Sequence, residues 1–341
     1  IRRQAAGELS ALFGAVAIDA DKRNRFHRFR SRAQVIWEQT PDGERDLMDA
    51  YSAGVNAGLG SLDARPWEYL LLRTAPEPWR PQDSLLVMYA MYMTLNDERA
   101  SNEVRRGLAH SILPAEVYGW MYPQGTPWDA PIMGEAREPA AIPGPDIFSL
   151  RNVMDSASPV RETGRYPLRG SNNWAVSGAL TATGRALVSN DMHLGHRNPN
   201  IWYQARLLVA GPDPVEVAGV TLPGGPFVVS GTNTRVAWGY TNSYGDWVDA
   251  VLLQPGARAG TYRTPEGDLE FDVHVEIIEV RDGEDVEYEV RETIWGPVLD
   301  DIDYPLGEVA VSWIAHKPEG INFRLFDVER ADTVFEALDI A

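Results

Sequence analysis

The chain of 341 residues contains no cysteine, and it is poor in positive charge. Without thiols it cannot form a disulfide, use a thiolate nucleophile or build a zinc–sulfur site. Lysine and arginine together number 31 against 49 acidic residues, which gives a formal net charge of −18. A charge of this sign repels phosphate backbones and anionic membrane surfaces. We therefore expect neither nucleic acid nor a membrane as a partner.

Long hydrophobic runs are also missing, since no stretch approaches the roughly 18 apolar residues that a membrane-spanning helix needs. No signal peptide is visible, but the chain starts with Ile1 rather than methionine. Its last residues, 333–341, stop inside an apolar pattern. We therefore expect a piece of a longer protein, in which the lack of a targeting signal carries little weight.

The composition changes twice along the chain, which predicts three regions. Residues 1–125 have helical spacing, with one helix expected over 47–59 and a longer one over 85–106. Residues 126–170 are rich in proline and predict the end of the helical region followed by a spacer. Residues 171–341 consist of short apolar runs between turn residues, as in antiparallel strands. This order predicts an α+β fold.

Finer patterns give further expectations. The three leucines at 70–72 are expected in the core. A hairpin is expected from 270–280 and 286–293, joined through Asp282 and Gly283, because Asp-Gly favours tight turns. The other expected strands are 174–177, 185–189, 201–209, 215–220, 227–230, 236–239 and 248–253.

One segment suggests chemistry: residues 170–178, which read GSNNWAVSG. A serine hydroxyl is a weak nucleophile until a base takes its proton. If the bond between Gly170 and Ser171 breaks, Ser171 gains an α-amine whose reference pKa is about 7.7–8, and partial burial would lower that pKa further. Glycine tolerates the strained backbone that such a cut requires. Composition alone favours the alternative, a turn that enters a strand, because glycine, serine and asparagine are the common turn residues.

Other motifs help to decide between a reactive serine and a plain turn. They are GRALVSNDMHLG at 184–195, PNIWY at 199–203, VAWGYTN at 236–242, GDWVD at 245–249, AGVNA at 53–57, PEPW at 76–79 and PQDS at 81–84. Together with the serine segment they resemble the penicillin amidase (penicillin acylase) family of N-terminal-nucleophile hydrolases. The resemblance implies an αββα fold and a precursor that cuts itself before Ser171. It also implies release of a spacer, which leaves an α/β heterodimer.

The resemblance implies roles for two more residues. The backbone N–H of Asn242 would donate to the oxyanion, with a second donor beyond residue 341. His193 would contact the nucleophile and orient its amine, although Met192 stands where relatives often have proline. Their structural alternatives are a turn asparagine and a histidine that only satisfies local hydrogen bonds.

A calcium site is expected at the motif GDWVD, residues 245–249. The carboxylates of Asp246 and Asp249 and the carbonyl of Val248 are hard oxygen ligands at a spacing that suits calcium. The resemblance adds Glu103, so that the ion would tie the two chains together without taking part in catalysis. The alternative is a solvated acidic turn.

A zinc site is the competing metal prediction. Asp191, His193 and His196 could bind zinc and give a metallohydrolase. The segment has the pattern of a loop, however, and its spacing fits no helical metal motif.

The function implied by the resemblance is hydrolysis of a linear amide in an N-acylated small molecule, through an acyl-enzyme on Ser171 and without a catalytic cofactor. Penicillins, cephalosporins and N-acyl-homoserine lactones are the implied substrates, and the periplasm is the implied location. Phe227, Trp202 and Trp247 are candidate walls of the substrate pocket. The alternative is an unprocessed, non-catalytic relative that binds small molecules.

Overall fold

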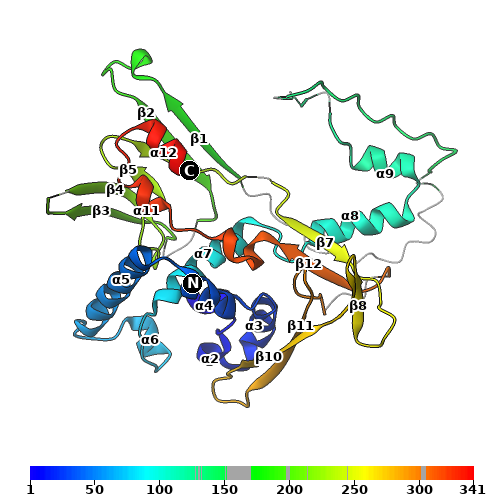
Figure 1. The fold of residues 1–341 in the computed structure, drawn as a ribbon, viewed down its shortest axis with the longest axis horizontal. Coiled ribbons are helices and arrows are strands. Elements are labelled where there is room, and N and C mark those ends of the chain that lie inside the picture. Colours follow the sequence, from blue (N-terminus) through cyan, green and yellow to red (C-terminus); the bar gives the residue numbers. More distant parts are fainter. Residues whose placement is uncertain are drawn as a thin grey trace.

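The computed structural model describes residues 1–126, 128–129, 131, 133–149, 151, 170–196, 200–212, 214–243, 245–300 and 305–341. Helices make up the first part of the chain, and antiparallel strands dominate the part after residue 170 (Figure 1). The predicted α+β class is therefore confirmed. Most of the predicted spacer, residues 152–169, lies outside the described residues. No helix in the described part of the chain is both long and apolar enough to cross a bilayer.

The helices of the first part follow one another with short connections. They are α1 (Arg2–Ala6), α2 (Ser10–Phe13), α3 (Ile18–Arg25), α4 (Phe29–Gln39), α5 (Asp42–Gly60), α6 (Trp67–Leu71), α7 (Pro81–Leu95), α8 (Ser101–Ile112) and α9 (Ala115–Met121). α7 begins at Pro81, where the missing N–H costs no helical hydrogen bond. The carboxylate of Asp83 accepts from the backbone N–H of Arg80 and closes the first turn.

The single helix expected over 85–106 is wrong, because α7 ends at Leu95 and α8 begins only at Ser101. Between them Ala100 has a left-handed φ of 52°, which stops helical propagation. The side chain of Asp97 accepts from the backbone N–H of Asn102 at 2.6 Å. This cap starts a new helix.

The expectation that leucines 70–72 lie in the core is also wrong. Leu70 and Leu71 are 58% and 74% exposed. They belong to the five-residue helix α6. Three consecutive residues of a helix point in three directions, so they cannot share one buried face.

Every strand pairing in the described chain is antiparallel. The strands are β1 (Gly170–Val176), β2 (Leu187–His193), β3 (Tyr203–Val209), β4 (Val215–Thr221), β5 (Ser230–Thr232), β6 (Ala237–Trp238), β7 (Val248–Leu252), β8 (Thr261–Thr264), β9 (Gly267–Glu270), β10 (Asp272–Ile278), β11 (Val286–Glu292) and β12 (Val309–Trp313). They pair as β1–β2, β3–β4–β5–β6, β7–β12, β8–β9 and β10–β11. Two short helices, α11 (Leu325–Val328) and α12 (Val334–Ile340), follow.

The predicted hairpin is confirmed as β10–β11, with Ile278 opposite Val286. The strand expected at 227–230 is present only at Ser230. Its first residues are buried but do not extend the sheet, since the backbone N–H of Val228 donates to the carboxylate of Glu329 at 2.7 Å.

The main hydrophobic core combines side chains from both sides of residue 170. Phe29 on α4 stacks on Tyr89 of α7 with ring centroids 4.1 Å apart. The ring of Phe29 also meets Trp313 of β12 edge-on at 5.7 Å. All three side chains are almost fully buried. The helical part and the strand part therefore share one core (Figure 1).

Two buried histidines join the same two parts of the chain. His27 Nδ1 lies 3.0 Å from Nε2 of His316. Burial, reinforced by the nearby cations Arg99 and Arg32, lowers the pKa of His27 well below its usual 6.5. Burial, together with Arg32 and His27, likewise lowers the pKa of His316 well below 6.5. Both rings are therefore neutral at pH 7.

This pair predicts that stability is lost as the pH falls below 6.5. Above pH 6.5 both histidines are unprotonated in the folded and in the unfolded protein. Below this pH the unfolded chain binds these protons and the folded protein does not, so unfolding becomes easier by up to about 2.7 kcal/mol per pH unit for two groups. Urea denaturation at pH 7.5 and 5.5 measures the loss of unfolding free energy between the two pH values. His27→Gln should roughly halve this loss. The control His110→Gln, at an exposed position, should leave it unchanged. Equal stability at both pH values would contradict it.

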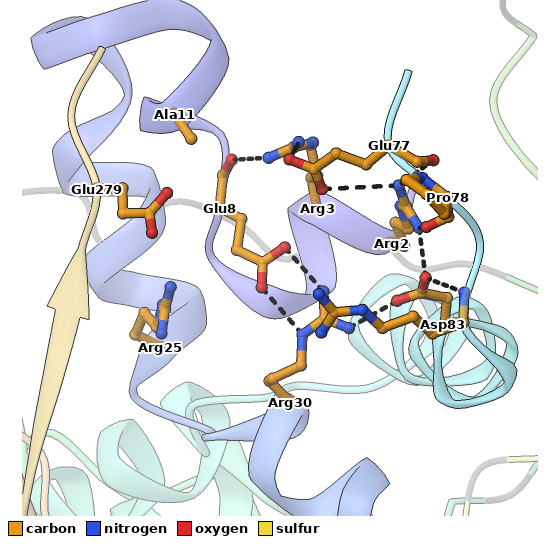
Figure 2. Close-up of a pocket in the computed structure, with 11 residues that line it drawn as sticks. Arg2, Arg3, Glu8, Ala11, Arg25, Arg30, Glu77, Pro78, Asp83 and Glu279 are labelled. Atoms are coloured by element: carbon orange, nitrogen blue, oxygen red, sulfur yellow. Dashed lines mark hydrogen bonds and ion pairs between the residues drawn. The ribbon is translucent and has the colours of Figure 1, made fainter. Parts of the chain in front are cut away.

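A second buried polar cluster joins α1, α4 and α7 (Figure 2). Asp83 is 1% exposed and accepts from Nη1 of Arg2, from Nη1 of Arg30 at 2.6 Å and from the backbone N–H of Arg80. Arg30 also binds the carboxylate of Glu8 through two hydrogen bonds of 2.9 and 2.8 Å. The buried charge of Asp83 is thus fully paired.

Candidate active site

Ser171 lies near the start of β1, which pairs along its whole length with β2. The register places Gly170 opposite His193 and Ser171 opposite Met192. The hydroxyl of Ser171 donates to the carbonyl oxygen of Gly170 at 2.8 Å. The oxygen that would attack is therefore beside the carbonyl group that precedes it.

The backbone N–H of Asn242 points at the same hydroxyl. Its nitrogen lies 3.3 Å from Oγ of Ser171, although 71 positions separate the two residues. A fixed backbone N–H at such a position can stabilise negative charge that develops beside the serine. The structure thus brings together Ser171 and the backbone N–H of Asn242, the two groups that the sequence motifs predict as nucleophile and oxyanion donor.

Asparagine side chains, for which the sequence motifs predicted no role, connect β1 to the segment that carries Asn242. Nδ2 of Asn190 donates to the carbonyl oxygens of Asn172 at 3.2 Å and Tyr240 at 3.0 Å. Nδ2 of Asn173 donates to the carbonyl oxygen of Gly239. The only sequence signal was the density of asparagine in these motifs.

His193 lies beside Gly170, the residue before Ser171. A Cβ atom placed on Gly170 would be 3.6 Å from Nδ1 of His193. Nε2 of the ring is 3.2 Å from Nδ2 of Asn172 and 3.1 Å from the carboxylate of Asp191. The ring is thus next to the 170–171 bond, and its predicted role in orienting the amine stays a prediction.

The zinc alternative finds no support among the described residues. Asp191 and His193 are neighbours, but no three His, Asp or Glu side chains in the described part of the chain are grouped as metal ligands. His196 therefore does not complete a site with them.

The elements expected to hold calcium are adjacent, but their carboxylates do not converge. α8, which carries Glu103, packs beside β7, which carries Val248 and Asp249 (Figure 1). The Glu103 carboxylate forms a 3.4 Å ion pair with Arg106, and Asp246 is exposed. The calcium site stays a prediction.

Chelation tests it on the full-length protein. A bound ion that links α8 to β7 should stabilise the fold by about 2.7 kcal/mol when calcium is present at 100 times its Kd. We therefore expect the melting temperature to fall in a chelator and to recover with calcium but not magnesium. Glu103→Gln should make melting insensitive to the chelator. An unchanged wild-type melting curve in the chelator would count against a calcium site.

A cavity of about 610 Å³ opens beside Ser171 and Asn242. This volume is typical of small-molecule sites. Phe227, Trp202 and Trp247 line this cavity, and their role as walls of a substrate pocket stays a prediction. The helical part supplies the facing wall, through Met88, Met91, Tyr92 and Leu95 of α7.

Two tyrosines add neutral polar groups to this cavity. Burial raises the pKa of Tyr92 and that of Tyr240, so both phenols keep their protons at neutral pH. Tyr92 donates its hydrogen to the carbonyl oxygen of Gly320. This bond connects α7 to the strand part across one edge of the cavity.

Comparisons with known proteins agree on one family. The sequence profile described as penicillin amidase matches residues 1–341. Acyl-homoserine lactone acylase QuiP of Pseudomonas syringae pv. syringae (strain B728a) is 26% identical over 346 residues, covering 99% of this chain and 41% of that protein. Penicillin acylase 2 proenzyme of Pseudomonas sp. (strain SE83) is 31% identical over 305 residues, covering 87% of this chain and 38% of that protein.

A solved structure of thermostable penicillin G acylase from Alcaligenes faecalis also matches, with a TM-score of 0.37 and 29% identity over 42% of this chain and 26% of that chain. The chain spans 41% and 38% of the length of the two acylases named above. Their family is the one that the sequence motifs resemble. Because its profile matches the chain from the first residue to the last, this protein belongs to the penicillin amidase family.

Proposed function

We propose that this chain is part of a self-processing amidohydrolase that cleaves a linear amide of an N-acylated small molecule. One observation carries the proposal: Oγ of Ser171 lies 2.8 Å from the carbonyl oxygen of Gly170 and 3.3 Å from the backbone nitrogen of Asn242, at the wall of a largely apolar cavity. Relatives named acyl-homoserine lactone acylase and penicillin acylase support the same class of substrate.

The first reaction would be the cut before Ser171. Oγ attacks the carbonyl carbon of Gly170, the C–N bond breaks, and the hydroxyl proton passes to the departing nitrogen. The resulting ester between Gly170 and Oγ is then hydrolysed by water. The products are a carboxylate on Gly170 and a serine with a free α-amine.

The second reaction would use that amine as the base. It takes the proton from Oγ as the oxygen attacks the substrate carbonyl, and the Asn242 N–H stabilises the negative charge on the substrate oxygen. The amine product leaves with the proton. Water then hydrolyses the ester and restores Ser171.

The wider assembly follows from the same proposal. The two polypeptides would form an α/β heterodimer from one precursor, with calcium as a structural ion at Glu103, Asp246, Val248 and Asp249. The periplasm is the location that the family resemblance suggests. The cavity walls, which include Leu95 and Leu325, favour apolar acyl groups over charged ones.

The test is made on the full-length protein. Intact-mass measurement should find a chain that begins at Ser171. Amine release should then be measured with penicillin G and with N-acyl-homoserine lactones of short and long acyl chains, and at least one should be hydrolysed. Turnover by a protein whose 170–171 bond is intact would refute the proposal. Binding of these compounds without cleavage or turnover would favour the non-catalytic alternative instead.

A further inference from the structure

We infer that Asn190 is a positioning residue that holds the oxyanion-binding segment, residues 239–242, against the nucleophile strand β1. The inference rests on the proposed function, because it concerns the distance between Ser171 and Asn242. It assigns a task to a side chain that touches neither substrate nor nucleophile.

The contacts of Asn190 span two elements that do not pair with each other. In the described chain β1 pairs only with β2, whereas residues 239–242 follow β6 of the four-stranded sheet. The two hydrogens of one carboxamide connect them, through the carbonyl oxygens of Asn172 and Tyr240. Among the described residues, no backbone pairing connects β1 to residues 239–242, so the Asn190 side chain links them directly.

The two ends of this link lie close to the reacting groups. Asn172 directly follows Ser171, and Tyr240 is two residues before Asn242. Because each peptide unit is planar, only the φ and ψ dihedrals of one or two residues separate each anchored carbonyl from its reacting group. A shift of about 1 Å in a catalytic group can cost roughly 100-fold in rate. Loss of the Asn190 link should therefore change the 3.3 Å separation on which the oxyanion donor depends.

The residues around Asn190 allow the segment 239–242 to approach it closely. A Cβ atom on Gly239 would lie 2.8 Å from Cβ of Asn190, so the segment can approach only because residue 239 is glycine. Asn173 adds a second tether to the same glycine through its carbonyl oxygen. The orientation of the Asn190 amide follows from its partners, since a flipped amide would face two carbonyl oxygens with a third oxygen.

The residue type is also specific. Aspartate has the same shape but no hydrogen to donate at neutral pH, so it would set a carboxylate against two carbonyl oxygens. Alanine would remove both bonds without adding repulsion. Alanine therefore tests the loss of the two hydrogen bonds, and aspartate tests their replacement by repulsion between oxygen atoms.

The experiment uses the full-length protein with Asn190→Ala and Asn190→Asp. Rates are divided by the number of working serines, which an acylating inhibitor titrates. We expect kcat to fall about 100-fold for Asn190→Ala and further for Asn190→Asp, with KM within threefold of wild type, because the interaction acts on the transition state. Leu187→Ala, at an exposed position on the same strand, is the control and should keep wild-type kcat.

Two outcomes overturn the inference. One is a kcat within threefold of wild type for Asn190→Ala. The other, should that variant fail to fold, is an unchanged kcat for Gly239→Ala, whose added methyl displaces Asn190. Either result, with activity still dependent on Ser171, ends the positioning role alone. Full activity in Ser171→Ala would end the proposed function itself.

Discussion

We expect the Ser171→Ala substitution to abolish both the proposed cut before residue 171 and the proposed hydrolysis of amides. A methyl group cannot attack the carbonyl carbon of Gly170, so the chain stays whole and no α-amine forms. The loss in turnover should be on the order of 10⁶-fold, the scale seen when an enzyme loses its nucleophile. Intact-mass measurement and amine release on the full-length variant report the two losses separately.

Ser177→Ala is the matched control for this variant. Ser177 lies in the same segment, where its hydroxyl accepts from the backbone N–H of Ala179 at 3.3 Å at the start of a short turn. Its loss should leave both the cut and the turnover intact. A Ser171→Ala protein that is still cut before residue 171, or still releases amine, would contradict the assignment.

Asp83→Asn should destabilise the folded protein by about 3–5 kcal/mol, because it removes one partner from a buried ion-pair cluster. The neutral amide leaves Arg2 without its buried carboxylate and places an NH₂ group where a guanidinium donated (Figure 2). Arg30 keeps Glu8 as a partner, which limits the loss. Urea denaturation followed by tryptophan fluorescence measures the change.

Glu77→Gln is the control for the buried cluster. Glu77 pairs with Arg3 at 2.6 Å, but its side chain is 60% exposed. Solvent screens such a pair, so its loss should cost no more than about 1 kcal/mol. Equal destabilisation by both variants would show that burial of Asp83 does not set the effect.

Local patterns in the sequence predicted much of the fold. The hairpin around Asp282 depends on residues that are neighbours in the chain. The errors arose where local pattern was ambiguous. Residues 85–106 begin with an apolar helical pattern that does not mark the break at Ala100, and Leu70 and Leu71 are exposed although their run of three leucines resembles a core segment.

The candidate site divides in the same way. Ser171, Asn242 and His193 were named from motifs, and the structure places each of them at or beside the 170–171 bond. The link made by Asn190 could not be predicted, because its two acceptors lie 18 and 50 positions away from it. Backbone carbonyls also carry no residue-specific signal.

The core that both parts of the chain share would have a consequence for the protein after the proposed cut. Phe29 and Tyr89 lie before the proposed cut and Trp313 lies after it, and exposing any of these buried side chains to water would cost free energy. Subunit exchange between molecules would require that exposure. After the proposed cut, each molecule should therefore keep the two polypeptides that come from its own precursor, so mixing isotope-labelled and unlabelled cleaved protein should produce no hybrids.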